Sequence, residues 1–208
     1  MTIDQRQTSA PRLLRDHPLA SSLPFVRGWL RNPTPTGLPF PSSPWTARRL
    51  AQAALDAAIP DSGPVLELGA GTGAVTEALI ESGCPLDRIV AVERDAELCR
   101  SLEQRFPGLH VLQGDALELG SLAGARPSSV GVVLSGLPMR AIAADAAVRC
   151  YSDAFQLMPR GGAIIQYTYG LRPPVDPQAT ALKLDAAFVG REWRNFPPMG
   201  IWRYSRAG

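Results

Sequence analysis

Continuous apolar runs alternate with amphipathic stretches from about residue 45 to the end of the chain. An apolar run without polar alternation is typical of a strand buried on both faces, and an amphipathic stretch between two such runs is typical of a covering helix. The pattern therefore predicts an α/β domain whose parallel sheet lies between two layers of helices. The predicted strands are 64–68, 89–93, 109–113, 130–134, 163–169, 188–195 and 201–206, and the predicted helices are 45–59, 74–82, 96–106 and 145–158.

The region before residue 45 has a different pattern. Residues 22–31 place Phe25 and Trp29 on one broad apolar face of a short helix, with Arg27 and Arg31 beside that face. Two interpretations stay open. The helix closes over the domain as part of its core, or it lies in a membrane interface with its apolar face in lipid and its arginines at phosphates.

Residues 32–43 are rich in proline, which predicts an extended, semi-rigid arm. The arm leads into the helix that directly precedes the first strand, so Ser43 and Trp45 are candidates for a wall or lid of a ligand pocket. We therefore divide the chain into an N-terminal extension, residues 1–44, and a folded domain, residues 45–208.

Three glycines at alternate positions, Gly69, Gly71 and Gly73, follow the first predicted strand and precede a helix. Glycine lets the backbone turn sharply and approach a ligand closely, and the start of a helix offers unpaired N–H groups. The stretch predicts a ligand in the turn, but such turns serve dinucleotides, phosphates and nucleosides alike.

Acidic residues at the ends of the next two strands narrow that choice. Glu93 ends the second strand, where a carboxylate suits a ribose diol, and Asp115 follows the third strand, where it suits an adenine amino group. Together ELGAGTG, VE and GDA resemble the S-adenosylmethionine site of the Rossmann-like methyltransferases; the alternative is a structural turn with two incidental surface acids. The resemblance implies a cofactor site of Glu67, Gly69, Ala70, Gly71, Thr72, Gly73, Glu93, Arg94, Gly114, Asp115, Ala116 and Ser135.

The residues after the fourth predicted strand would face the cofactor's methyl group. Related enzymes that methylate adenine carry Asn or Asp, Pro-Pro and an aromatic residue there. This chain keeps the backbone carbonyls and the proline but has Ser135 and Met139 at the polar and aromatic positions, which counts against a nucleobase substrate. Tyr167 and Tyr169 alternate along one predicted strand and either contact a methylated ammonium or simply pack. The candidate catalytic residues are Ser135, Gly136, Leu137, Pro138, Tyr167 and Tyr169.

A wider set of motifs extends along nearly the whole chain: PxxTG…PSS, ELGAGTGAVTEALI, RFP…GDA, SGLP, GGAIIQYTYG and WRNFPP…IWRYSR. Together they resemble the bacterial phospholipid N-methyltransferases of the type related to ribosomal RNA adenine dimethylases. The resemblance implies a Rossmann-like class I S-adenosylmethionine-dependent methyltransferase fold, with a seven-stranded, mostly parallel sheet, an antiparallel last strand and an N-terminal amphipathic helical extension. It also implies methylation of phosphatidylethanolamine, through its monomethyl and dimethyl forms, towards phosphatidylcholine. S-adenosyl-L-methionine is then the donor and S-adenosyl-L-homocysteine the product.

Three alternatives stay open beside that function. The first is methylation of another aminolipid, such as an ornithine lipid. The second is an RNA adenine N-methyltransferase, which would carry an N-x-P-aromatic loop and usually a further C-terminal helical domain. The third is a non-catalytic, cofactor-binding membrane adaptor.

The net charge of +2 is unevenly distributed. Residues 1–50 hold seven arginines against two aspartates, 51–159 hold seven arginines against fourteen acids, and 160–208 hold seven basic residues against three acids. All four tryptophans lie in the two basic segments, a combination that suits an anionic membrane surface. We therefore expect a cytoplasmic protein, peripherally associated with the inner face of the cell membrane, that binds phospholipid and not nucleic acid. The candidate substrate or membrane residues are Phe25, Arg27, Trp29, Arg31, Ser43, Trp45, Arg172 and Arg203.

The cysteines Cys84, Cys99 and Cys150 lie far apart, without C-x-x-C spacing, and the chain has only two histidines. This pattern predicts reduced, buried thiols and neither a metal site nor a disulfide framework. No apolar run approaches the roughly 20 residues of a transmembrane helix, and the polar start of the chain lacks the apolar core of a signal peptide. We expect a monomer.

Overall fold

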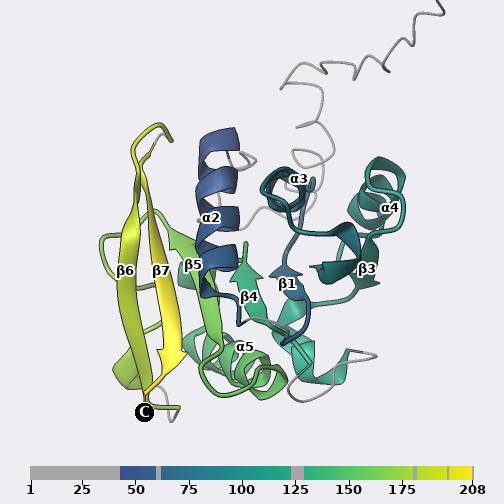
Figure 1. Cartoon of the computed structure of the whole chain (residues 1–208). Helices are drawn as coiled ribbons and strands as arrows, with labels where there is room; N and C mark the ends of the chain where they lie inside the picture. Colours follow the sequence, from purple (N-terminus) through teal and green to yellow (C-terminus); the bar gives the residue numbers. More distant parts are fainter. Residues whose placement is uncertain (1–42, 60–61, 123–128, 180–181, 196, 208) are drawn as a thin grey trace, which may run out of the picture.

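The sheet has seven strands in the order β3-β2-β1-β4-β5-β7-β6 (Figure 1). The computed structural model describes residues 43–59, 62–122, 129–179, 182–195 and 197–207. Five strands run parallel, whereas β7 is antiparallel to both of its neighbours, β5 and β6. The predicted sheet with an antiparallel last strand is confirmed. The strands are β1 (Val65–Leu68), β2 (Ile89–Glu93), β3 (His110–Gln113), β4 (Val132–Ser135), β5 (Ala163–Thr168), β6 (Leu184–Glu192) and β7 (Met199–Arg206).

Helices cover both faces of the sheet, as the apolar strand pattern predicts. One buried cluster joins the sheet to α2 (Pro44–Ala57), α3 (Ala74–Glu81) and α4 (Ala96–Arg105). A second cluster joins the other face to α5 (Ala144–Leu157) and the 3₁₀ turn η2 (Ala116–Ser121). Three shorter 3₁₀ turns complete the set: η1 (Leu86–Arg88), η3 (Met139–Ala141) and η4 (Pro177–Ala179).

The predicted elements are correct in kind, and their ends differ where local chemistry decides. Ser43 caps α2 by accepting a hydrogen bond from the Thr46 N–H at 3.3 Å, so the helix begins at Pro44. β4 ends at Ser135, one residue later than predicted. β6 begins at Leu184, four residues earlier than predicted, because an edge strand bonded only to β7 carries polar residues that an apolar search misses.

The predicted amphipathic helix at residues 22–31 and most of the proline-rich arm lie outside the described residues. The roles predicted for Phe25, Arg27, Trp29 and Arg31 therefore stay predictions, as does the division of the chain at residue 44.

The thiols of Cys84, Cys99 and Cys150 are all buried and form no disulfide, as predicted. The Cys150 thiol donates to the Ala116 carbonyl at 3.2 Å, and burial raises its pKa to about 12. Among the described residues, no group of three His, Cys, Asp or Glu side chains could hold a metal ion. In the same part of the chain, no helix is both long and apolar enough to cross a bilayer.

Candidate active site at the carboxyl edge of the sheet

The strand order reverses between β1 and β4, and in open α/β sheets such a switch point marks the ligand crevice beyond the carboxyl ends of the strands. Two loops meet there, the glycine turn after β1 and the loop after β4. The Gly136 N–H donates to the Leu68 carbonyl at 2.7 Å, and the Gly69 N–H donates to the Val92 carbonyl of β2 at 2.9 Å. Backbone hydrogen bonds therefore fix both loops to the neighbouring strands.

The glycine turn has the left-handed conformation that glycine permits, with φ angles of +72°, +58° and +82° at Gly69, Gly71 and Gly73. A Cβ atom at Gly69 would lie 2.9 Å from the Leu137 Cδ2 atom, and one at Gly73 would lie 2.7 Å from the Phe106 Cε2 atom. The turn thus needs glycine at both positions, for its conformation and for space.

Glu93 connects the end of β2 to this turn. Its Oε1 atom accepts hydrogen bonds from the Arg94 and Asp95 N–H groups at 2.9 and 3.0 Å, and its Oε2 atom accepts one from the Gly71 N–H at 2.9 Å. A carboxylate offers about four acceptor positions, so these three bonds leave one for a ribose hydroxyl. The side chain is buried beside the turn, and its chemistry fits the nucleoside that the sequence predicts.

Asp115 lies past the end of β3, where the sequence places an adenine contact. Its Oδ1 atom accepts from the Leu117 N–H at 2.9 Å, and its Oδ2 atom accepts no hydrogen bond from the described part of the chain. The adjacent Gly114 N–H donates to the Glu93 carbonyl at 2.9 Å, which holds the two acidic residues at one edge. Ala116 is buried beside them. The predicted cofactor residues of β1, β2 and β3 therefore share one edge of the sheet.

Glu67 has a different environment from its predicted cofactor neighbours. It is buried within β1, and its Oε2 atom accepts a hydrogen bond from the Thr76 hydroxyl of α3 at 2.6 Å. Burial raises the pKa of this carboxyl from 4.5 to about 7, although the hydrogen bonds from Thr76 lower it in part. The described contacts of Glu67 fasten α3 to the sheet, and its contact with a cofactor stays a prediction.

The loop after β4 is held by polar side chains of β5. Ser135 is the last residue of β4 and is fully buried, and its Oγ atom accepts from the Leu137 N–H at 3.4 Å. The Tyr167 hydroxyl donates to the Gly136 carbonyl at 3.0 Å, and the Gln166 Nε2 atom donates to the Leu137 carbonyl at 2.9 Å. Tyr167 thus positions the loop, a role that the sequence did not suggest.

Gln166 is a residue of the candidate site that the sequence analysis missed. It is fully buried, and its Oε1 atom lies 3.2 Å from the Tyr151 hydroxyl, which completes a network from α5 through β5 to the loop. One signal was available, because a glutamine inside the apolar run 163–168 must find buried partners.

The predicted strand face of Tyr167 and Tyr169 is wrong, because β5 ends at Thr168 and Tyr169 lies beyond it. Tyr169 is partly exposed; burial of part of its ring raises the pKa of its hydroxyl, and a hydrogen bond with Asn195 lowers that pKa in part. Its hydroxyl therefore connects the end of β5 to the segment between β6 and β7.

The residues predicted to contact the headgroup lie in different parts of the structure. Ser43 caps α2, and Trp45 is exposed in the first turn of the same helix. Arg172 is exposed just after the carboxyl end of β5. Arg203 pairs with Ile165 in the middle of β5, so it lies away from the carboxyl edge.

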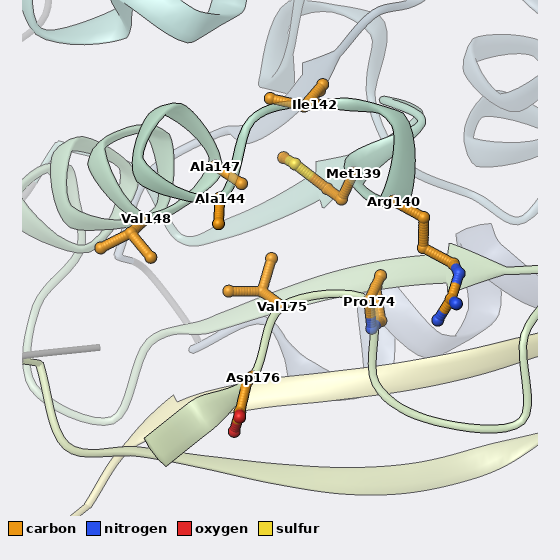
Figure 2. Close-up of a pocket in the computed structure, with 9 residues that line it drawn as sticks. All are labelled: Met139, Arg140, Ile142, Ala144, Ala147, Val148, Pro174, Val175 and Asp176. Atoms are coloured by element: carbon orange, nitrogen blue, oxygen red, sulfur yellow. The ribbon is translucent and has the colours of Figure 1, made fainter. Parts of the chain in front are cut away.

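A small apolar pocket of about 280 Å³ lies next to the loop after β4 (Figure 2). Figure 2 shows the side chains of Met139, Ala147 and Val175 directed into one space, with Arg140 at its side and the Asp176 carboxylate directed away. Met139 directly follows Pro138, so the pocket adjoins the loop predicted to carry the acceptor. A Cβ atom on Gly170 would lie 3.0 Å from the Arg140 Nη1 atom, which places this guanidinium against the segment after β5.

Comparisons with known sequences give matches over different lengths of the chain. A family model described as ribosomal RNA adenine dimethylase matches residues 46–123. An ornithine lipid N-methyltransferase from Singulisphaera acidiphila is 28% identical over 184 residues, which cover 86% of this chain and 92% of that protein. A ribosomal RNA small subunit methyltransferase A from a Synechococcus species is 47% identical over 58 residues, which cover 26% of this chain and 20% of that protein.

Solved structures share the arrangement of the sheet and helices. A TehB-like S-adenosylmethionine-dependent methyltransferase from Corynebacterium glutamicum has a TM-score of 0.57 at 14% identity, over 91% of this chain and all of that chain. A magnesium protoporphyrin IX methyltransferase from Synechocystis, solved with bound S-adenosylmethionine, has a TM-score of 0.56 at 14% identity, over 79% of each chain. This chain has the class I methyltransferase fold. The predicted fold is confirmed, and the match to the ribosomal RNA adenine dimethylase model supports the predicted S-adenosylmethionine cofactor.

Apart from Ser135, which is predicted for both roles, the residues predicted to hold the cofactor come before those predicted to meet the acceptor in the chain. The glycine turn, Glu93 and Asp115 all lie within the match to the ribosomal RNA adenine dimethylase model. The loop after β4, β5 and the β6–β7 hairpin all lie after residue 123, outside that match. The similarity to the ornithine lipid enzyme, over 86% of the chain, extends into this second part as well.

The raised pKa of Glu67 predicts a specific dependence of stability on pH. The folded carboxyl keeps its proton up to about pH 7, whereas the unfolded one loses it near 4.5, so the free energy of unfolding falls as pH rises between these values. The total fall from this residue is on the order of 3 kcal/mol. Glu67→Gln cannot ionise and should become more stable, relative to the wild type, between about pH 5 and pH 7.5 in urea unfolding.

The exposed Glu103→Gln variant is the control for this experiment and should keep the wild-type pH profile. If the free energies of unfolding of the wild type and Glu67→Gln changed in parallel with pH, the raised pKa of Glu67 would be contradicted.

The contact between Gly69 and Leu137 predicts that the glycine turn tolerates no side chain. Gly69→Ala adds the strain of a left-handed residue and displaces Leu137, so affinity for S-adenosylhomocysteine should fall roughly tenfold, or about 1.4 kcal/mol. Gly83→Ala is the matched control, because Gly83 has a φ of +91° with nothing near its Cβ position. Gly83→Ala should bear the same strain and keep wild-type affinity for S-adenosylhomocysteine in calorimetry. Equal affinity in the two variants would show that the Gly69 position tolerates a side chain.

Proposed function

We propose that the protein is an S-adenosylmethionine-dependent N-methyltransferase that acts on a membrane aminolipid. Ornithine lipid is the first candidate acceptor and phosphatidylethanolamine the second, which reverses the order given by the sequence motifs. The observation that carries the proposal is the extent of each similarity. The ribosomal RNA model ends at residue 123, whereas similarity to the ornithine lipid enzyme covers 86% of the chain and includes acceptor-side elements.

The donor side of the proposal rests on the carboxyl edge of β1, β2 and β3. S-adenosylmethionine supplies a methyl group activated on a sulfonium. The glycine turn would approach the methionine and ribose part closely, Glu93 would accept from a ribose hydroxyl, and Asp115 would accept from the adenine amino group. Arg94 is exposed and would contribute its backbone, whose N–H already orients the Glu93 carboxylate.

The acceptor side rests on the carbonyl of Gly136. It already accepts one hydrogen bond from Tyr167 of β5, and a carbonyl oxygen has a second lone pair for an N–H of the acceptor amine. The neighbouring Leu137 carbonyl accepts from both Gln166 and the Met139 N–H, so it holds the loop in place instead. The bond to Gly136 would direct the lone pair of the neutral amine towards the donor, because methyl transfer requires the three reacting atoms in line. Such positioning contributes up to about 7–11 kcal/mol in favourable cases.

Met139 supports an aliphatic acceptor over a planar base. Adenine-methylating enzymes resembling this chain carry an aromatic residue there for stacking, but Met139 is buried in the apolar pocket and offers no exposed surface. A pocket lined by methionine, valine and alanine beside the loop suits hydrocarbon of the acceptor instead.

Arg140 is a better candidate for the acceptor's anionic group than Arg203. Both candidate lipids carry an anion a few bonds from the amine, a carboxylate in ornithine lipid and a phosphate in phosphatidylethanolamine. Arg140 lies two residues after Pro138, whereas Arg203 lies towards the middle of the sheet. Its guanidinium could form charge-assisted hydrogen bonds with either anion.

A substrate panel tests the proposed function directly. The purified protein is incubated with labelled S-adenosylmethionine and, separately, with ornithine lipid, phosphatidylethanolamine and ribosomal RNA. We expect methylated lipid with the amine as the modified group, and a higher kcat/KM for ornithine lipid. Labelled RNA without labelled lipid would reject the proposal. Bound S-adenosylmethionine without any turnover would support the non-catalytic adaptor instead.

Replacing Arg140 tests the anion contact. Arg140→Gln should raise KM for the aminolipid about tenfold, because a charge-assisted hydrogen bond contributes about 1.5–3 kcal/mol, and should leave cofactor affinity unchanged. The control is Arg160→Gln, since Arg160 is also exposed but lies between α5 and the amino end of β5. An unchanged KM in Arg140→Gln would remove Arg140 from the acceptor site.

A further inference from the structure

The β6–β7 hairpin carries exposed aromatic residues from the middle of β6 to the turn, a stretch we call its tip. Trp193 is 74% exposed and Phe188 is 51% exposed, and Trp45 of α2, which lies against the tip, is 46% exposed. Val189 adds a further exposed apolar side chain. Scattered apolar residues on a surface are ordinary, but a contiguous patch marks an interaction site.

Arginines join these side chains into one surface. The Arg191 Cζ atom lies 5.8 Å from the centre of the Phe188 ring and 5.7 Å from that of Trp193. The Arg194 Cζ atom lies 4.5 Å from the centre of the Trp45 ring, across more than a hundred residues of sequence. We name Trp45, Phe188, Val189, Arg191, Trp193 and Arg194 the hairpin-tip surface.

The charge of the hairpin-tip surface is positive. Among the described residues, neither Arg191 nor Arg194 has a carboxylate partner within ion-pair distance. The nearby Glu192 is buried and accepts a hydrogen bond from the Arg194 N–H at 2.8 Å, so its carboxylate is turned inwards. The surface therefore combines free guanidinium groups with exposed indole rings.

The position of this surface relates it to the acceptor loop. In Figure 1 the hairpin extends past the start of α2 at the carboxyl edge of the sheet, where β1, β4 and β5 also end. Tyr169, which follows β5, is hydrogen-bonded to Asn195 of the tip. A partner on the hairpin-tip surface would thus lie at the same edge of the sheet as the loop after β4, which is proposed to hold the acceptor amine.

We propose that the hairpin-tip surface docks on membranes that contain anionic lipid, with its tryptophans among the headgroups and its arginines at phosphates. The inference rests on the proposed function for its purpose, because an aminolipid has to be presented to the acceptor loop from a bilayer. The chemistry favours this partner: indole rings suit the membrane interface, and each arginine near an anionic surface contributes to attraction.

Vesicle binding of the full-length protein tests the docking surface without involving catalysis. The vesicles contain phosphatidylcholine alone or phosphatidylcholine with phosphatidylglycerol, so they offer no acceptor amine. We expect tighter binding to the anionic vesicles. Trp193→Ala should weaken this binding about tenfold and Arg194→Gln about fivefold. Arg160→Gln, which removes an exposed arginine at the opposite edge of the sheet, should bind as the wild type does.

A second readout separates docking from turnover. With aminolipid dispersed in detergent, Trp193→Ala and Arg194→Gln should keep wild-type kcat and wild-type affinity for S-adenosylhomocysteine. Both side chains are exposed, so thermal unfolding should also be unchanged.

Three outcomes would overturn the docking surface. The first is wild-type vesicle binding by both variants, and the second is equal binding of the wild type to neutral and anionic vesicles. The third is a wild-type dimer that Trp193→Ala converts to a monomer without loss of vesicle binding, since the surface would then belong to a second copy. If no aminolipid is methylated but the variants lose vesicle binding, the proposed function fails and the docking surface stands.

Discussion

The close approach of two backbones at the ends of β1 and β4 is the constraint on which the rest of the site depends. The Gly136 N–H bonds to the Leu68 carbonyl at 2.7 Å, and a Cβ atom at Gly136 would lie 2.8 Å from the Gly69 carbonyl oxygen. Reacting atoms in a productive geometry lie about 3–3.5 Å apart. If these loops hold donor and acceptor as proposed, the two substrates can meet only where the loops touch, and side chains at these glycines would keep the loops apart.

Each loop is made rigid by a different buried network. Glu93 organises the donor loop through three backbone N–H groups, and Gln166 and Tyr167 organise the acceptor loop through two carbonyls. Buried polar networks of this kind hold one geometry well when every member is satisfied. The acceptor carbonyls are thus positioned from β5, a strand that contributes nothing to the glycine turn. The donor and acceptor halves meet at one edge but are stabilised separately.

Local patterns predicted the sheet well because each buried strand is a continuous apolar run that ends in a turn signal, as in Val65–Leu68 before the three glycines. The same logic placed Glu93 and Asp115 at one edge, since carboxyl ends of parallel strands coincide. Contacts between distant segments were not predictable in this way. Nothing local indicates that Tyr167 bonds to Gly136 or that Arg194 lies over Trp45, because these pairs exist only after the sheet has formed.

The antiparallel β7 separates the outer strand β6 from the five parallel strands. β6 is bonded to β7 alone, so the hairpin tip can lengthen, shorten or change its composition while the register of the five parallel strands stays intact. Loops on a rigid scaffold tolerate such changes well. The proposed docking surface can therefore change in composition without disturbing the strand ends that carry the candidate site.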